Sequence, residues 1–325
     1  MPNKESVEAM PFGNISINIV GSQFWENEGY VKQLLEVVQH TLNQAINEKK
    51  LRCESLRLIV VAADFPKEVI RWQQQITGEA TGVSSSPEGE AFGKTLIWYT
   101  DKTESPYAII ILKEEVAWWL INGDLLGSAV LIHELAHVHA DYLLYHSNIP
   151  QVTATRLNDW AALQQAIAQW IWSEFFASFV AHPYLRDRID AAVTGGIDRL
   201  QGVHQRVTQE IAAYRNHGDM GKLWSFVVTE LSDGLLELGR TIGILTAARH
   251  NGDNHFDQFL AEIDKVSSSW GLAVRRLAVG LAGLEDQEQF SLESFDRLCE
   301  VVQYAFRAMG LYPEPRQAGL WVEVP

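Results

Sequence analysis

Cysteine is scarce in this chain. Only Cys53 and Cys299 occur among its 325 residues, too few for a disulfide framework, so both thiols are expected to be structural. Long apolar runs are missing as well. No stretch of about 18 apolar residues is free of charge, and the opening sequence Met-Pro-Asn-Lys-Glu-Ser has no apolar signal core. We therefore expect a cytoplasmic protein that does not associate with membranes.

Positive charge is also in short supply. The chain has 26 Lys and Arg against 41 Asp and Glu, a net charge of −15, and no run rich in Lys or Arg. Nucleic acids are bound through clustered positive charge, so this composition predicts no nucleic-acid partner. The hydrophobic content of 47% is sufficient for a large core, in one two-lobed unit or two domains.

The segment from His133 to His137 reads His-Glu-Leu-Ala-His and carries the strongest functional signal. Residues four apart on an α-helix lie on nearly the same face, so the two histidines could share one metal ion. Glu134 is offset by one position, which suits a carboxylate that reaches a metal-bound water. Bound Zn²⁺ lowers the pKa of that water to about 7, so a carboxylate base suffices. The motif therefore predicts a zinc-dependent hydrolase.

The surroundings of the motif predict a buried helix. No proline interrupts residues 124–148, and apolar residues flank both histidines. The pattern should arise by chance in roughly one or two of a hundred chains of this length. A core helix with incidental histidines is the alternative interpretation.

A catalytic zinc site usually takes three protein ligands, and Glu174 is our candidate for the third. Leu163, Ile167, Ile171 and Glu174 follow a 4-4-3 spacing, which places this carboxylate on an apolar helical stripe. A charge there must be paired, protonated or bound to metal. A salt bridge to an arginine elsewhere is the alternative.

Two residues beside the motif compete for roles at this site. Asp141 lies four residues after His137, so it could orient that imidazole or ligate the metal directly. Orientation is favoured, because three ligands along one straight helix would spread over about 12 Å. His139 is about 200° round the helix from His137 and is expected to be structural.

With its two histidines and downstream helical glutamate, the segment 130–180 resembles the gluzincin branch of the zincin metallopeptidases. The metzincin extension is absent, because Ala140 and Leu143 stand where that family has glycine and histidine. Ser178 replaces the aspartate that gluzincins often carry four residues after the ligand glutamate. His139 stands where zincin helices usually have an apolar residue.

The resemblance implies a Zn²⁺ ion held by His133, His137 and Glu174, with Glu134 as the catalytic base. It further implies a zincin-like fold and a peptide or protein substrate attacked by activated water. Two other hypotheses stay open. One is a noncatalytic zincin-like scaffold that binds a protein partner through its helical C-terminal half, and the other is a zinc hydrolase with a non-peptide substrate.

Periodicity predicts an α+β chain in two parts. Residues 1–150 should form a mixed β-sheet with helices that leads to the motif helix, and residues 151–325 should form a mostly α-helical subdomain that carries Glu174. Strands are expected at 14–20, 56–61, 95–99 and 107–112, and helices at 28–48, 66–76, 157–182, 196–216, 220–249, 255–284 and 291–309.

Other parts of the site follow from the same resemblance. In zincins an edge strand beside the active-site helix pairs with extended peptide, and residues 94–100 are our candidate for that strand. Residues 77–93, rich in Gly, Ser and Glu, should form a loop, either over the cleft or as a plain connection. Candidates for stabilising an oxyanion stay unranked: Tyr142, Tyr145, His146, His182, Tyr184, His204 and His250.

Overall fold

The computed structural model describes residues 6–12, 15–21, 26–78, 85–86, 89–98, 106–149, 159–285, 287–316 and 319–325. The chain is α+β and divides into two compact units. The first comprises Met1–Tyr142 and Pro183–Leu185, and the second comprises Leu143–His182 and Arg186–Pro325. The boundary therefore falls inside helix α4 (Leu125–His146), which carries the histidine motif.

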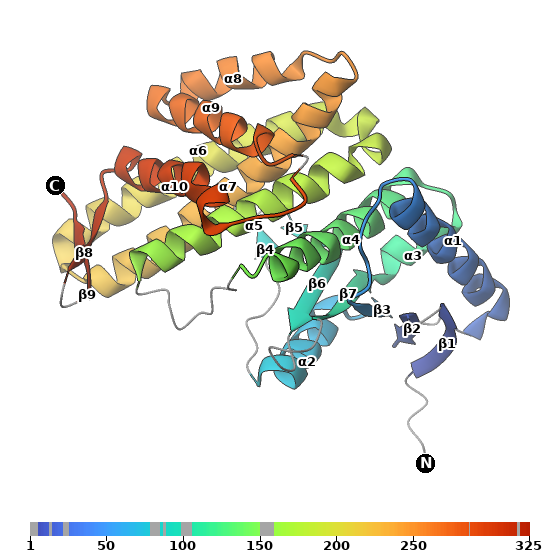
Figure 1. Cartoon of the computed structure of the whole chain (residues 1–325). Coiled ribbons are helices and arrows are strands. Elements are labelled where there is room, and N and C mark those ends of the chain that lie inside the picture. Colours follow the sequence, from blue (N-terminus) through green and yellow to red (C-terminus); the bar gives the residue numbers. More distant parts are fainter. Residues whose placement is uncertain are drawn as a thin grey trace. The chain divides into compact units, whose positions relative to one another are not determined.

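The first unit is built on a five-stranded mixed sheet (Figure 1). In spatial order its strands are β1 (Ser6–Phe12), β2 (Ile15–Val20), β3 (Leu56–Ala62), β7 (Tyr107–Lys113) and β6 (Gly93–Trp98). The three central strands run parallel, and the outer strands β1 and β6 are antiparallel to their neighbours. Parallel neighbours need a crossover, which helix α1 (Glu28–Asn47) supplies between β2 and β3.

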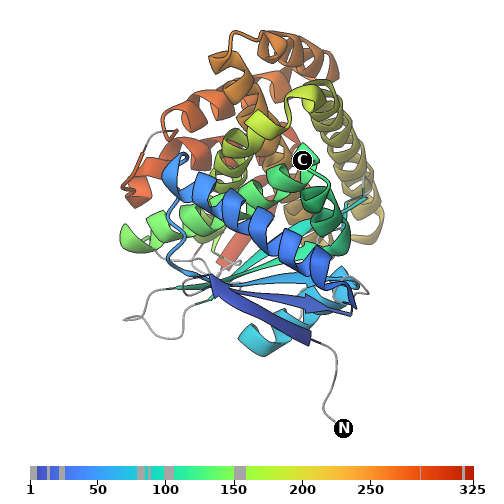
Figure 2. The ribbon, with the colours of Figure 1, turned by 90° about the vertical axis from the view of Figure 1, so that its right-hand side faces the viewer.

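Helices cover both faces of this sheet (Figure 2). Helix α2 (Phe65–Thr77) lies on one face, and α1 and α3 (Glu114–Ile121) lie on the other. The central strands β3 and β7 are continuous apolar runs, as expected for strands buried on both sides. The core beneath α2 consists of Val60, Ala62, Phe65, Val69, Ile109 and Ile111.

Helix α4 begins where Asp124 caps it, with Oδ1 accepting a hydrogen bond from the Leu126 N–H at 2.9 Å. Its apolar residues occupy all sides of the helix and most are buried, which is typical of a core helix. The members with the least exposure are Leu131, Ile132, Leu135, Ala136 and Val138. His133 and His137 are half-buried, so the packing of their neighbours fixes where they lie.

The second unit is mostly helical. Its elements are α5 (Trp160–Ala181), α6 (Ile189–His217), α7 (Met220–His250), α8 (His255–Val266), α9 (Ser268–Ala282), α10 (Asp296–Ala308) and a hairpin of β8 (Tyr312–Arg316) and β9 (Gly319–Glu323). Helix α7 packs along both α5 and α6 (Figure 1). In the described part of the chain, no helix is both long enough and apolar enough to cross a membrane.

Most of the expected elements are confirmed, with boundaries shifted by a few residues. The single helix expected at 255–284 is wrong: α8 and α9 meet at Ser267, whose extended backbone (φ −167°, ψ 134°) breaks the helix. The C-terminal hairpin, β1 and α3 were not predicted.

The loop expected at 77–93 contains a short pair of strands. β4 (Ser85–Ser86) pairs with β5 (Gly89–Glu90), while 79–84 and 87–88 lie outside the described residues. The last residues of the expected edge strand, 99–100, also lie outside them. The strand itself is confirmed as β6, at the edge of the sheet.

Two glycines of α7 allow that helix to pack so closely on α5 that its backbone meets backbone atoms of α5. A Cβ added to Gly239 would lie 2.8 Å from the Ile171 carbonyl oxygen, and a Cβ added to Gly243 would lie 2.3 Å from the Phe175 carbonyl oxygen. Main-chain atoms of a buried helix cannot move aside as a flexible side chain can. The α5–α7 crossing therefore depends on the absence of side chains at these two positions.

We expect Gly243→Ala to lower the free energy of unfolding by about 3 kcal/mol, because the new methyl group would force α5 and α7 apart. Gly195→Ala in α6 is the matched control, since an added Cβ there meets no heavy atom within 4 Å. Because alanine has a higher helix propensity than glycine, Gly195→Ala should raise the free energy of unfolding by about 0.5–1 kcal/mol. Urea unfolding followed by circular dichroism measures both; equal stabilities of Gly243→Ala and wild type would contradict the close crossing.

Candidate metal centre

The two motif histidines converge on one point beside α4. Their Nε2 atoms lie 3.1 Å apart, and the ring planes are nearly perpendicular, at 85°. Two nitrogens bound to one tetrahedral zinc at about 2.05 Å would be about 3.3 Å apart. The spacing of His133 and His137 thus matches, within a few tenths of an ångström, the spacing that a shared zinc ion requires.

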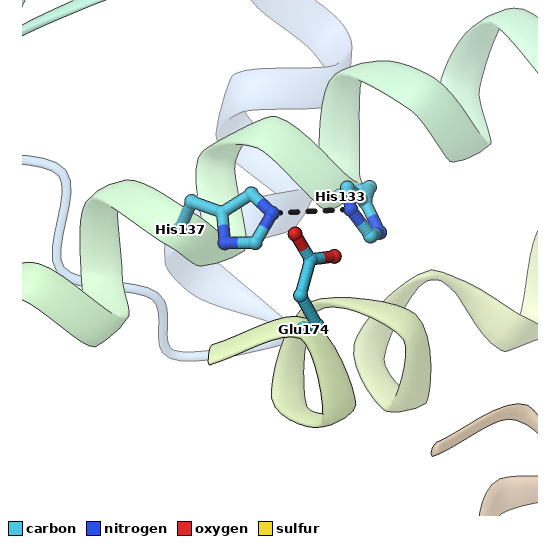
Figure 3. A group of neighbouring side chains, drawn as sticks. All are labelled: His133, His137 and Glu174. Atoms are coloured by element: carbon cyan, nitrogen blue, oxygen red, sulfur yellow. Dashed lines mark hydrogen bonds between the residues drawn. The ribbon is translucent and has the colours of Figure 1, made fainter. Parts of the chain in front are cut away.

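A carboxylate completes a group of three potential ligands. His133, His137 and Glu174 each offer one ligand atom, and these atoms lie within 4.8 Å of one another. Figure 3 shows the Glu174 carboxylate and the two imidazoles turned toward one another. Among the described residues this is the one group of three or more His, Cys, Asp or Glu side chains with such spacing. Two imidazoles and one carboxylate are a donor set that zinc uses in open, catalytic sites.

Glu174 also forms the salt bridge that was the alternative to a zinc bond. Within the second unit, Arg240 of α7 donates from Nε to Oε2 at 2.7 Å and from Nη2 to Oε1 at 3.1 Å. The Glu174 side chain is 14% exposed and that of Arg240 is 45% exposed. This carboxylate raises the pKa of Arg240, mainly by charge attraction. The two alternatives are compatible, because a carboxylate has about four lone-pair positions.

Glu134 lies against the edge strand β6. The side chain is only 7% exposed, and its Oε2 accepts a hydrogen bond from Thr95 Oγ1 at 2.7 Å. An added Cβ on Gly93 would lie 2.8 Å from both Cγ and Oε1 of Glu134. The carboxylate therefore sits between α4 and two small residues of one strand.

His139 and Asp141 lie on α4 outside the three-ligand group. The Nδ1 atom of His139 accepts a hydrogen bond from the Arg52 N–H at 2.8 Å. Burial, with a smaller effect from Arg52, lowers the pKa of His139 to about 4, so the imidazole is neutral at pH 7 and can accept this bond. These contacts agree with a structural role. Asp141 is 8% exposed and does not belong to the group with Glu174.

Both thiols lie in surroundings that disfavour the thiolate. Burial is the main cause that raises the pKa of Cys53 and of Cys299 to about 12. The thiolate is the reactive form of cysteine, so neither side chain is suited to act as a nucleophile at neutral pH.

Several of the oxyanion candidates are engaged elsewhere in their own unit. Tyr184 lies 3.4 Å from Gln44, His204 accepts from the Trp270 indole at 3.3 Å, and His250 lies 3.5 Å from Glu285. His182 is buried at the end of α5. The oxyanion role has no assigned residue.

Sequence reasoning missed two residues of the site. Arg240 was foreseen only as an unspecified arginine: it is three residues from Glu237, with which it also forms an ion pair at 3.2 Å, so no local pattern pointed to Glu174. Thr95 was not singled out, although Gly93 and Thr95 share one face of the expected strand. Their two-residue spacing was the one feature of the sequence that could have indicated a shared contact.

Comparison of the chain with protein-family models, curated proteins and solved structures finds no match. Any function must therefore be argued from the motif and from the geometry described above.

We expect Arg240→Met to lower the free energy of unfolding of the metal-free protein by about 1–2 kcal/mol. The substitution leaves a largely buried carboxylate without its guanidinium, and the partial exposure of Arg240 reduces the effect. Glu174→Gln combined with Arg240→Met should cost less than the sum of the two single changes. Additive effects in that double-mutant cycle would show that the two side chains do not interact.

Proposed function

We propose that this protein is a zinc-dependent metallopeptidase with a zincin-like fold. The observation that carries the proposal is the 3.1 Å separation of the Nε2 atoms of His133 and His137 on one buried helix. Glu134 follows the first histidine directly and is held at the edge of the sheet. This arrangement would supply two metal ligands and an adjacent carboxylate base, as water activation requires.

Glu174 is the proposed third ligand. It belongs to the group of three ligand atoms within 4.8 Å, and its donor type fits zinc with two imidazoles. One carboxylate oxygen would bind the metal while Arg240 retains the other. Three protein ligands leave a position open for water, which separates a catalytic zinc site from a structural one.

The chemistry then follows from the protein side chains. Bound zinc would supply a water molecule of lowered pKa and polarise the substrate carbonyl. Glu134 would accept the proton of that water and later deliver it to the leaving amine. Its low exposure restricts access of bulk water to this proton.

The edge strand β6 suits an extended peptide. Its neighbour within the sheet is β7, so an extended segment could add to the opposite side of β6 by main-chain pairing. Such pairing is largely independent of side chains, which favours a peptide or protein substrate over other substrates with a hydrolysable bond. Thr95 in this strand contacts Glu134, so a paired peptide would lie beside the proposed base.

A noncatalytic scaffold that binds a partner protein is the second candidate. The ion pair between Glu174 and Arg240 favours it, because it satisfies the carboxylate without any metal. Peptide cleavage decides between the two, since a noncatalytic scaffold, with or without a structural metal, would hydrolyse no peptide.

We expect wild-type protein to hold about one zinc per chain and to cleave a library of unstructured peptides. Glu134→Gln should keep the zinc and lower kcat by at least about a hundredfold, because the amide cannot accept the proton. His137→Ala should lose both zinc and activity. Glu36→Gln and His40→Ala on the exposed face of α1 are the matched controls. Elemental analysis and mass spectrometry of the products provide the measurements; full activity in Glu134→Gln would refute the assigned base.

The third ligand has its own test. Glu174→Ala should weaken zinc binding far more than Asp141→Ala, by about a hundredfold or more against about tenfold. Competition with a chromogenic zinc chelator measures both dissociation constants. The reverse order of affinities would make Asp141 the ligand and would assign Glu174 to the ion pair with Arg240 alone.

A further inference from the structure

Two small residues of the edge strand enclose the carboxylate of Glu134. Thr95 Oγ1 donates to Oε2 at 2.7 Å and also lies 3.1 Å from the backbone oxygen of Glu134. Gly93 is two residues earlier, so both residues face the same side of β6. The two oxygens of the carboxylate thus have different neighbours: Oε2 has the Thr95 hydroxyl, and Oε1 lies against Gly93.

This close contact is possible only because residue 93 has no side chain. An ideal Cβ there would come within 2.8 Å of Oε1 and Cγ and 3.0 Å of Cδ of Glu134, closer than real Cβ contacts allow. Gly93 is itself buried. Any larger residue would push the carboxylate away from this position and from the Thr95 hydroxyl.

We propose that Thr95 is a positioning residue for the catalytic base, holding Oε2 of Glu134 so that Oε1, beside Gly93, takes the proton from water. The inference rests on the proposed metallopeptidase function. A glutamate side chain has three rotatable bonds, and its freedom to rotate about them is lost only where a partner fixes its end. The Thr95 hydroxyl is such a partner, and its bond to a charged acceptor is stronger than one to a neutral group.

As a consequence, one strand, β6, would have two roles at the proposed site. The segment that would pair with peptide also orients the base through Thr95 and packs against its carboxylate at Gly93. A purely structural threonine would instead stabilise the fold without affecting the rate. The rate of turnover, zinc content and stability therefore separate the two roles.

The test compares Thr95→Val, which replaces the hydroxyl by a methyl group of similar size, with Thr95→Ser, which retains the hydroxyl. Thr95→Val should lower kcat by about tenfold to a hundredfold with KM, zinc content and unfolding midpoint close to wild type. Thr95→Ser should recover most of the lost rate. Thr41→Val is the matched control: this buried threonine of α1 donates to the Val37 carbonyl oxygen at 3.0 Å and should leave kcat unchanged.

Crystal structures of the metal-free wild type and Thr95→Val provide a readout that does not depend on activity. Wild type should show one Glu134 conformer bound to Thr95, and the variant should show several. If wild type binds zinc and hydrolyses no peptide, the proposed function fails, and these structures still decide whether Thr95 holds Glu134. Unchanged kcat in Thr95→Val, an equal loss in Thr95→Ser, loss of zinc, or an unchanged single Glu134 conformer would each overturn the positioning role.

Discussion

The convergence of two imidazoles on one turn of α4 is the constraint on which the candidate site depends. Side chains four residues apart meet only while their helix keeps its rotation and height. In α4 the apolar residues Leu131, Ile132, Leu135, Ala136 and Val138 are fully buried, whereas the two histidines are only half-buried, so rotating the helix would move core residues toward water. The burial of these neighbours therefore fixes where the His133 and His137 nitrogens lie. A substitution that disturbs the packing of α4 should therefore also disturb the proposed metal site.

The ion pair of Glu174 and Arg240 balances the carboxylate charge when no metal is bound. A charged carboxylate in apolar surroundings costs free energy of folding unless a nearby cation balances its charge. The guanidinium supplies that compensation from α7, whose close contact with α5 is permitted by Gly239 and Gly243. The arrangement would suit a metal ligand, because the ion pair keeps Glu174 charged and oriented without a metal.

The sequence was sufficient to predict most helices and strands, because their apolar residues recur at one regular spacing, as in α1. It was insufficient at Ser267, where helical spacing continues on both sides of the break and only the folded backbone shows the turn. The motif histidines and Glu174 could be proposed from local spacing. Arg240 and Thr95 could not, since they lie 66 and 39 residues from their partners, and such contacts depend on tertiary packing that no local pattern encodes.

The edge position of β6 has a consequence for the behaviour of the protein at high concentration. An edge strand that pairs with an extended peptide could equally pair with the same strand from another copy, which is the first step of aggregation. The net charge of −15 opposes the approach of two whole copies, whereas a short peptide brings little charge of its own. Self-association through β6 should therefore be governed by ionic strength, with low salt keeping the chains apart.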